Sequence, residues 1–267
     1  MFNNINKSDY VKAQYSEDKN LSARINLHSK HSTNKQGVFA WGWEQYKFFN
    51  NCRILELGCG NGKQWENKSA SLPNGCEIIL SDLSEGMVNI VKGKFAEYKQ
   101  FSFQQIDIQD IPFPDETFDI VIANSMLYHV PDLTKALSEV KRVLKKGGKF
   151  YSSAGGNGGL PLFLHQAFKL FNPDTKLFTG QMTFNFQNGL DILSGYFSDV
   201  KRLEYIDSLS VTETQDLIDY IKSTIIITSR SEQDPDPDDL FDYFEEIRKK
   251  DGAINIPKEG GLFISTK

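Results

Sequence analysis

An apolar run that leads into three evenly spaced glycines most limits the folds open to this chain. Residues 54–62 read ILELGCGNG, so that Glu56 is followed by Gly58, Gly60 and Gly62. Because glycine has no Cβ atom, the backbone of such a loop can pass close to a ligand. We expect a helix to begin near Gly62, where its unpaired N–H groups and its dipole would favour an anionic ligand group, either a carboxylate or a phosphate.

A second apolar run indicates what that ligand is. Residues 77–82 predict a buried strand that ends at Asp82. This acid follows the glycine loop by about twenty residues, which is the usual place for an acid that holds a ribose. Short β-branched runs then alternate with segments of helical period as far as residue 153, as is typical of a parallel sheet with helices on both faces. We expect strands to begin near Arg53, Glu77, Phe101, Phe118 and Lys149.

The rest of the pattern predicts the helices and the remaining strands. Apolar residues recur at helical spacing from Leu133 to Leu144, with Asp132 as N-cap and Gly147 and Gly148 as the stop. Further helices are expected at 8–15, 21–31, 37–49, 160–170, 189–197, 212–221 and 240–249, and strands at 200–211 and 261–266. Residues 212–215 have the form of a capping box, and the last strand should pair antiparallel beside the sixth.

These segments resemble the class I S-adenosylmethionine-dependent methyltransferases, and among them the small-molecule enzymes of methyltransferase types 11 and 25. Glu56 and the three glycines match the first family motif, acid-x-Gly-x-Gly-x-Gly. Residues 81–84, 107–110, 118–124 and 144–150 match later segments in family order, over roughly the middle two-fifths of the chain. The resemblance implies an α/β fold with a Rossmann-like, mostly parallel sheet of seven strands in the order 3-2-1-4-5-7-6, in which strand 7 is antiparallel.

The same resemblance implies a division of the chain. Residues 1–50 would form a helical N-terminal cap that closes over the cofactor and the substrate. Residues 51–267 would form the methyltransferase core, with insertions on the substrate side at about 155–190 and 212–252. A simpler interpretation of the aromatic segment near Trp41 is that it covers the edge of the sheet.

The resemblance also assigns residues to the cofactor, S-adenosyl-L-methionine, whose product is S-adenosyl-L-homocysteine. The cofactor-binding residues that it implies are Glu56, Gly58, Cys59, Gly60, Asp82, Leu83, Met87, Asp107, Ile108 and Asn124. Glu56 and the glycines would hold the methionine end, Asp82 the ribose hydroxyls, and Leu83, Met87, Asp107 and Ile108 the adenine. Cys59 as a small filler, Met87 as ordinary helix core and Asp107 as a strand-end cap remain alternatives.

Methyl transfer is a displacement at carbon in which the enzyme mainly positions the reactants. It implies no obligatory nucleophile and no metal. A general base helps where the acceptor is a hydroxyl, thiol or protonated amine, and the end of the fourth strand faces the methyl group in this fold. His129 in that segment titrates near neutrality when unperturbed, so it is the candidate catalytic base, unless it only packs or caps the turn before Pro131.

Residues outside the motifs are assigned to the substrate pocket or the lid. These are Tyr15, Arg24, His28, Tyr128 and His165. They suggest an aromatic, uncharged pocket, although a covered sheet would give the same composition. The acceptor atom, whether O, N, S or C, stays open, because fold analogy does not name it.

The composition of the chain disfavours some classes of binding partner. The net charge is −5 and no run of Lys and Arg occurs, which disfavours nucleic acid. No apolar run approaches the roughly 20 residues of a membrane span, and the N-terminus lacks a signal core. The three cysteines have no metal-ligand spacing, so we expect reduced thiols. We therefore expect a cytoplasmic monomer or homodimer that acts on a small molecule without membrane or nucleic-acid partners.

Two other functions compete with methyl transfer. A nicotinamide-dependent oxidoreductase also begins with a strand and a glycine loop, but its fingerprint needs three residues between the second and third glycines, where Gly60 and Gly62 are separated by one. A non-catalytic sensor or assembly module that binds the cofactor would be marked by lost cofactor residues, and the motifs here are intact. DNA amino methylation is disfavoured because the fourth strand ends in Asn124-Ser-Met rather than in an Asn/Asp-Pro-Pro-aromatic motif.

Overall fold

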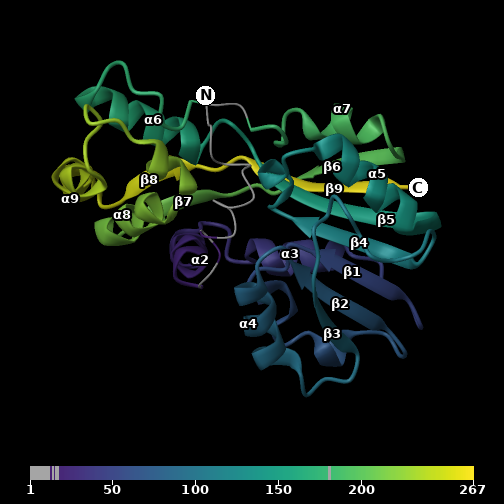
Figure 1. The fold of residues 1–267 in the computed structure, drawn as a ribbon. Coiled ribbons are helices and arrows are strands. Elements are labelled where there is room, and N and C mark those ends of the chain that lie inside the picture. The colour runs from purple at the N-terminus through teal and green to yellow at the C-terminus, as the bar shows by residue number, and fades with distance from the viewer. Residues whose placement is uncertain (1–12, 14, 16–17, 180–181) are drawn as a thin grey trace.

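A seven-stranded sheet forms the larger part of the molecule (Figure 1). The computed structural model describes residues 13, 15, 18–179 and 182–267. The strands lie in the order β3-β2-β1-β4-β5-β9-β6. Their bounds are Arg53–Leu57 (β1), Glu77–Asp82 (β2), Phe101–Gln105 (β3), Phe118–Asn124 (β4), Leu144–Gly155 (β5), Ser198–Glu204 (β6) and Gly260–Thr266 (β9). Strands β1 to β5 are parallel, whereas β9 is antiparallel to β5 and β6. The predicted order is confirmed, with β9 as the seventh strand.

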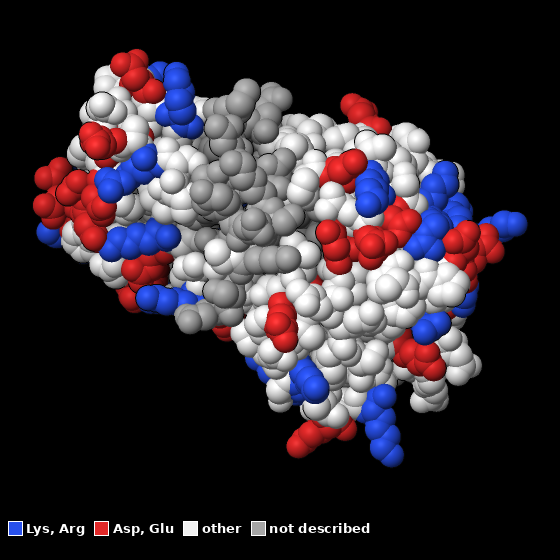
Figure 2. All heavy atoms as spheres, in the orientation of Figure 1, with Lys and Arg blue, Asp and Glu red and all other residues white. Residues whose placement is uncertain are grey.

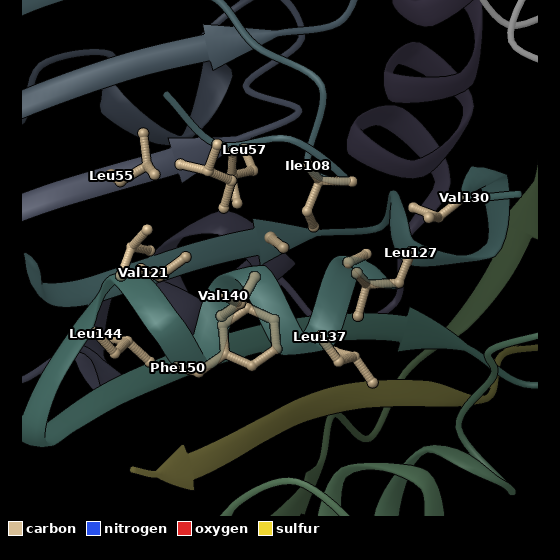
Figure 3. Close-up of a cluster of buried hydrophobic side chains, with 14 of the residues drawn as sticks. Leu55, Leu57, Ile108, Val121, Leu127, Val130, Leu137, Val140, Leu144 and Phe150 are labelled. Atoms are coloured by element: carbon tan, nitrogen blue, oxygen red, sulfur yellow. The ribbon is translucent and has the colours of Figure 1, made fainter. Parts of the chain in front are cut away.

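Helices pack on both faces of this sheet. On one face lies α4 (Glu85–Phe95), and on the other lie α5 (Leu133–Val143) and α7 (Gly189–Ser194). Because side chains alternate along a strand, Ile54 joins the core under α4 and Leu55 joins the core under α5. Figure 3 shows part of this second core, in which apolar side chains of α5 meet those of the strands. The predicted N-cap is confirmed, since Asp132 accepts a hydrogen bond from the Lys135 N–H at 2.9 Å.

Two details of the predicted core are wrong. Strand β5 begins at Leu144 rather than near Lys149, because Leu144 already pairs with Phe118 and the pairing shifts register before Lys149. Gly147 and Gly148 therefore lie inside an irregular strand instead of ending the helix. After β1, the expected helix near Gly62 is absent from the described residues. Two short 3₁₀ turns, η1 (Lys63–Trp65) and η2 (Ser69–Ser71), replace it.

The buried side chain of Trp65 explains the second difference. It is 1% exposed and packs edge-on against Trp43 and Phe101, while the neighbouring Gln64 donates to the Phe39 carbonyl at 3.0 Å. These contacts hold the segment against the first face of the sheet. Tertiary packing thus overrides the local preference for a helix.

A smaller lobe with its own apolar core lies beyond the carboxyl ends of β1 to β5, at left in Figure 1. It contains α2 (Lys19–His31), α6 (Leu160–Phe171), α8 (Thr214–Ser223), α9 (Phe241–Asp251) and the two-stranded sheet of β7 (Ser208–Val211) and β8 (Ile254–Pro257). Turns η4 (Ile225–Ser229) and η5 (Pro237–Leu240) join α8 to α9, and α3 (Val38–Gln45) follows α2. Helix α2 from the expected N-terminal cap therefore shares one apolar core with α6, α8 and α9 from the expected insertions.

The second half of the sequence was predicted less well. The single strand expected at 200–211 is two strands, β6 and β7, which belong to different sheets, and β8 was not foreseen. Helix α8 begins at Thr214 after Glu213, without a side-chain cap, so the capping box at 212–215 is wrong. The predicted helix at 8–15 lies outside the described residues, apart from Ala13 and Tyr15.

A further helix, η3 (Leu127–His129), is a short 3₁₀ turn that follows β4. Among the described residues, no helix is both long and apolar enough to cross a membrane.

Candidate functional site

A cavity of about 480 Å³ lies where the smaller lobe meets the carboxyl ends of the parallel strands. The loops after β1, β2, β4 and β5 line it, together with α2, α3 and Tyr220 of α8. It brings together these predicted residues: Tyr15, Arg24, His28, Glu56, Gly58, Cys59, Gly60, Asp82, Leu83, Asp107, Ile108, Asn124, Tyr128 and His129. Sequence-distant motifs thus converge on one space.

Two of the predicted residues do not line the cavity. Met87 is fully buried on α4, in agreement with the alternative that it is helix core. His165 lies on α6, where its Nδ1 is 2.9 Å from the Leu177 carbonyl oxygen. Both side chains serve the packing of their own helices.

The glycine loop after β1 has a backbone that only glycine adopts without strain. Gly58 and Gly60 have φ angles of 72° and 53°, in the left-handed region. A Cβ atom on Gly58 would lie 2.9 Å from Met126 Cγ, and one on Gly60 would lie 2.9 Å from Leu21 Cδ2. The loop therefore presents bare backbone to the cavity, while the Cys59 side chain is 9% exposed and held near it.

Asp82 is fixed at the end of β2 by two backbone donors. Its Oδ2 accepts from the Gly60 N–H and its Oδ1 accepts from the Ser84 N–H, both at 2.9 Å. Burial raises the pKa of Asp82, and these hydrogen bonds oppose the rise. Each carboxylate oxygen keeps a further lone pair, so that a pair of neighbouring hydroxyls, such as those of a ribose, fits this group.

Glu56 is a buried acid at the end of β1. It is 2% exposed, and its Oε2 accepts from the Trp65 indole N–H at 2.5 Å. Burial, opposed by Trp65 and helped by the charge of Asp82, raises the pKa of Glu56 to about 7. Glu56 lines the cavity. No basic side chain among the described residues forms an ion pair with it. An ammonium group bound there would supply the missing cation.

Asp107 caps a turn and also lines the cavity. Its Oδ1 accepts from the Gln109 N–H at 2.9 Å, and its backbone carbonyl accepts from the Asp110 N–H, so it does cap a turn. It also lines the cavity beside Leu83 and Ile108. This part of the wall combines apolar side chains with the Asp107 carboxylate and the Gln109 amide, which donates to both oxygens of that carboxylate.

The segment after β4 forms the opposite wall. Ser125 has a φ of 51°, which turns the chain sharply out of the strand. Asn124 donates to the Tyr46 hydroxyl at 2.7 Å. His129 Nε2 is 3.0 Å from the Tyr15 hydroxyl, and its ring lies 4.2 Å from that of Tyr128. His129 is thus held by aromatic residues on the wall of the cavity.

Helix α2 of the smaller lobe contributes two polar side chains, Arg24 and His28, to the cavity. Arg24 donates from Nη1 to the Tyr15 hydroxyl at 3.2 Å. His28 of the same helix stands edge-on to Tyr220, with ring centroids 5.8 Å apart. Burial, followed by the charge of Lys258, lowers the pKa of His28 to about 3, so its ring is neutral at physiological pH. The expectation of an uncharged pocket is wrong, because Arg24 lines the cavity.

The sequence interpretation missed Trp65, which supports the site from behind its wall, and several residues that line the cavity. Trp65 contacts Glu56 from just beyond the glycine loop, and an aromatic residue in that place was a signal that could have been used. Tyr46, Tyr220 and Lys258 reach the cavity from segments without a motif, so no sequence signal marked them. In the part of the chain that the structure describes, no group of three or more His, Cys, Asp or Glu side chains is arranged for a metal ion.

Comparison with known proteins agrees with this geometry. Residues 55–152 match the family described as methyltransferase domain. A demethylmenaquinone methyltransferase from Lactococcus lactis subsp. lactis is 34% identical over 131 residues, which are 48% of this chain and 52% of that protein. The chain spans about half, or less, of the length of the curated relatives it matches.

Solved structures share the whole fold at low sequence identity. The [4+2]-cyclase SpnF superposes with a TM-score of 0.60 at 17% identity, over 96% of this chain and 94% of that one. Phosphoethanolamine N-methyltransferase 2 from Haemonchus contortus, solved in complex with S-adenosyl-L-methionine, gives 0.58 at 17% identity, over 97% of this chain and 59% of that one. Residues 55–152 are therefore similar to the methyltransferase-domain family, and the strand order agrees with the fold of these structural neighbours.

Proposed function

We propose that this protein transfers the methyl group of S-adenosyl-L-methionine to a small-molecule acceptor within the cavity. The observation that carries the proposal is the continuity of that space. One cavity joins the glycine loop and Asp82 to the polar and aromatic wall that contains His129 and Arg24. A cofactor in the first half and an acceptor in the second would therefore meet at the end of β4.

The cofactor half fits each part of S-adenosyl-L-methionine. The unpaired carboxylate of Glu56 suits the ammonium group, and the pinned carboxylate of Asp82 suits the ribose diol. Bare backbone at Gly58 and Gly60 suits the methionine end, and a Cβ atom at either position would crowd Met126 or Leu21 on the cavity wall. Leu83, Asp107, Ile108 and Asn124 complete the proposed cofactor site, whereas Met87 is left out because it lies within the core.

Bound S-adenosyl-L-methionine supplies an activated methyl group whose leaving group is a neutral thioether. The protein then has to hold the acceptor in line and remove its proton where it carries one. His129 is the proposed base, with Tyr15 as its hydrogen-bond partner at 3.0 Å. Tyr15 also accepts from Arg24, so these three residues link the methyl side of the cavity to the smaller lobe.

A small aromatic acceptor fits the observations better than a macromolecule. The lining on the proposed acceptor side includes Phe39, Trp41 and Tyr128, and a matched relative is named a demethylmenaquinone methyltransferase. On the face drawn in Figure 2, acidic and basic side chains of the described residues are interspersed over both lobes. Such a surface lacks the continuous basic stripe of a nucleic-acid binder.

The fold alone does not decide for methyl transfer, since one structural neighbour is titled a cyclase. The deciding experiment gives the protein isotopically labelled S-adenosyl-L-methionine and a metabolite extract, and identifies the compound that gains label. Label in one small aromatic compound is expected. Cofactor binding without any labelled product would favour the sensor or assembly alternative. Binding of a nicotinamide dinucleotide in place of S-adenosylhomocysteine would refute the proposal.

The cofactor assignment has its own test. We expect Asp82→Ala to abolish S-adenosylhomocysteine binding in calorimetry, because it removes the only carboxylate proposed to hold the ribose. Asp242→Ala, which removes an exposed acid on α9, serves as the control and should bind normally. Circular dichroism checks the fold of both variants. Unchanged affinity of the Asp82→Ala protein would refute the ribose assignment.

A further inference from the structure

Arg24 is a partly buried cation on the wall of the cavity, and the described residues provide no counter-ion for it. Its guanidinium donates to the Tyr15 hydroxyl and, through Nε, to the Asn20 carbonyl. Nη2 is shielded from solvent and has no hydrogen-bond partner. No carboxylate forms an ion pair with it among the described residues. An unpaired buried charge is costly, so this arrangement indicates that a ligand supplies the anion.

A second unsatisfied group lies one helical turn further along α2. His28 Nδ1 is likewise buried without a partner, and its residue also lines the cavity. Positions four apart share a helix face, which puts both groups on the same side of α2. The low pKa of His28 leaves its ring neutral, so it offers hydrogen bonding without a second positive charge.

We propose that Arg24 and His28 form an acceptor-binding subsite for a singly charged anionic oxygen, either a carboxylate or a phenolate, on an aromatic body. This inference rests on the proposed function, because it places the subsite in the acceptor half of the cavity. Tyr15 connects the subsite to His129 through hydrogen bonds of 3.2 and 3.0 Å. The anion would anchor the acceptor from α2 while the reacting atom lies towards β4.

The charge balance favours a monoanion over a phosphate. Lys258 is the other cation close to His28, and it already pairs with Asp207, which is also bound by Ser32. Arg24 alone is therefore free to neutralise a ligand, and a doubly charged phosphate would remain half compensated. Apolar residues make up the wall around this subsite, among them Val38, Phe39, Leu160 and Pro161. An aromatic body would bury its surface against them.

The test uses four probes with one ring system and measures their binding to the protein saturated with S-adenosylhomocysteine. The probes are 1-naphthoate, ionised 4-nitro-1-naphthol, neutral 1-naphthamide and 1-naphthyl phosphate. We expect 1-naphthoate or the naphtholate to bind at least about tenfold more tightly than the amide, which lacks a charge for Arg24. The tighter of the two identifies the source of the anion, and the phosphate should bind less tightly than that probe.

Substitutions of Arg24 test whether this residue causes the preference for an anionic probe. Arg24→Gln should lower the affinity for the preferred anion by roughly 30-fold or more and leave the amide unchanged, whereas Arg24→Lys should retain part of the preference. Lys92→Gln, which removes an exposed charge on α4, is the matched control and should behave as the wild type. S-adenosylhomocysteine affinity should stay constant in all three variants.

Several results would overturn the subsite. These are equal binding of the amide and the anions, no measurable binding of any probe, tighter binding of the phosphate, or an Arg24→Gln protein with unchanged preference. If the Arg24→Gln protein does not fold, the ratio of amide to anion affinity in the wild type still decides whether the subsite binds an anion. Anion binding that depends on Arg24 in a protein that transfers no label would refute methyl transfer and retain the subsite.

Discussion

Glu56→Gln tests the electrostatic state of the buried acid at the end of β1. The change keeps the shape of the side chain and an oxygen that can accept from Trp65, but it removes the ability to ionise. Burial raises the pKa of Glu56 from 4.5 to about 7 in the folded protein. Below about pH 7 the neutral acid is therefore the favoured form of Glu56 in the folded protein. Stability linked to Glu56 is fully present below about pH 4.5 and is lost as the pH rises towards 7.

The size of the effect follows from these values. One pKa unit corresponds to about 1.4 kcal/mol, so at about pH 8.5 ionising Glu56 in the fold costs roughly 3 kcal/mol relative to the unfolded chain. At about pH 5 the same cost is under about 1 kcal/mol. The Glu56→Gln protein avoids this cost of ionisation at both pH values. Since about 1 kcal/mol shifts the melting temperature of a protein of this size by roughly 2–4 °C, the variant should melt about 6–12 °C higher at alkaline pH.

Thermal denaturation followed by circular dichroism, without cofactor, at the two pH values measures this difference. Glu97→Gln, which removes an exposed carboxyl beyond α4, is the control and should show no pH-dependent gain. S-adenosylhomocysteine should stabilise the wild type more than the Glu56→Gln protein, because its ammonium group loses an ionised partner. A variant that melts no higher than the wild type at alkaline pH would refute the assigned pKa and its cause.

Three other substitutions and one control test the glycine loop and the proposed base. Gly62→Ala should destabilise the fold by about 1–3 kcal/mol in urea denaturation, because Gly62 has a φ of 75° and a Cβ atom there would lie 2.6 Å from Phe95 Cε2. Gly93→Ala, in open space on α4, should instead be neutral or stabilising, and equal effects of the two would contradict the packing argument. His129→Ala should lower kcat by at least about 100-fold if it is the base, and undiminished turnover would remove it from that role. Tyr15→Phe should lower kcat less, because it removes only the hydroxyl that contacts His129, and a loss as large as that of His129→Ala would assign Tyr15 a direct part in proton transfer.

The cofactor half of the site was predictable because its chemistry is local. The strand that ends at Glu56 and the glycine loop lie next to each other in sequence, and Asp82 ends the following strand. Parallel strands bring their carboxyl ends to one edge. Period-2 and period-3.6 patterns therefore sufficed to predict the parallel strands, while the family resemblance implied the strand order and the proposed cofactor residues, most of which line one cavity.

The acceptor half could not be predicted, because long-range packing assembles it. Arg24 and His28 of α2 meet Tyr220 of α8 only because both helices join the core of the smaller lobe. Neither local propensity nor spacing shows that the chain after β6 leaves the main sheet to form β7. The same limit explains Trp65, whose burial against the sheet replaced the expected helix by a 3₁₀ turn.

The sequence by itself thus determined the parallel strands and the place of the glycine loop, and its family resemblance implied the strand order. The tertiary structure alone decided which side chains line the proposed acceptor side of the cavity and that one of them is a cation without a counter-ion among the described residues. The physical reason is that the apolar period of a strand or helix is set by neighbours along the chain. The charge and hydrogen-bond state of Arg24 depends instead on which distant groups the fold brings to it, or leaves away from it.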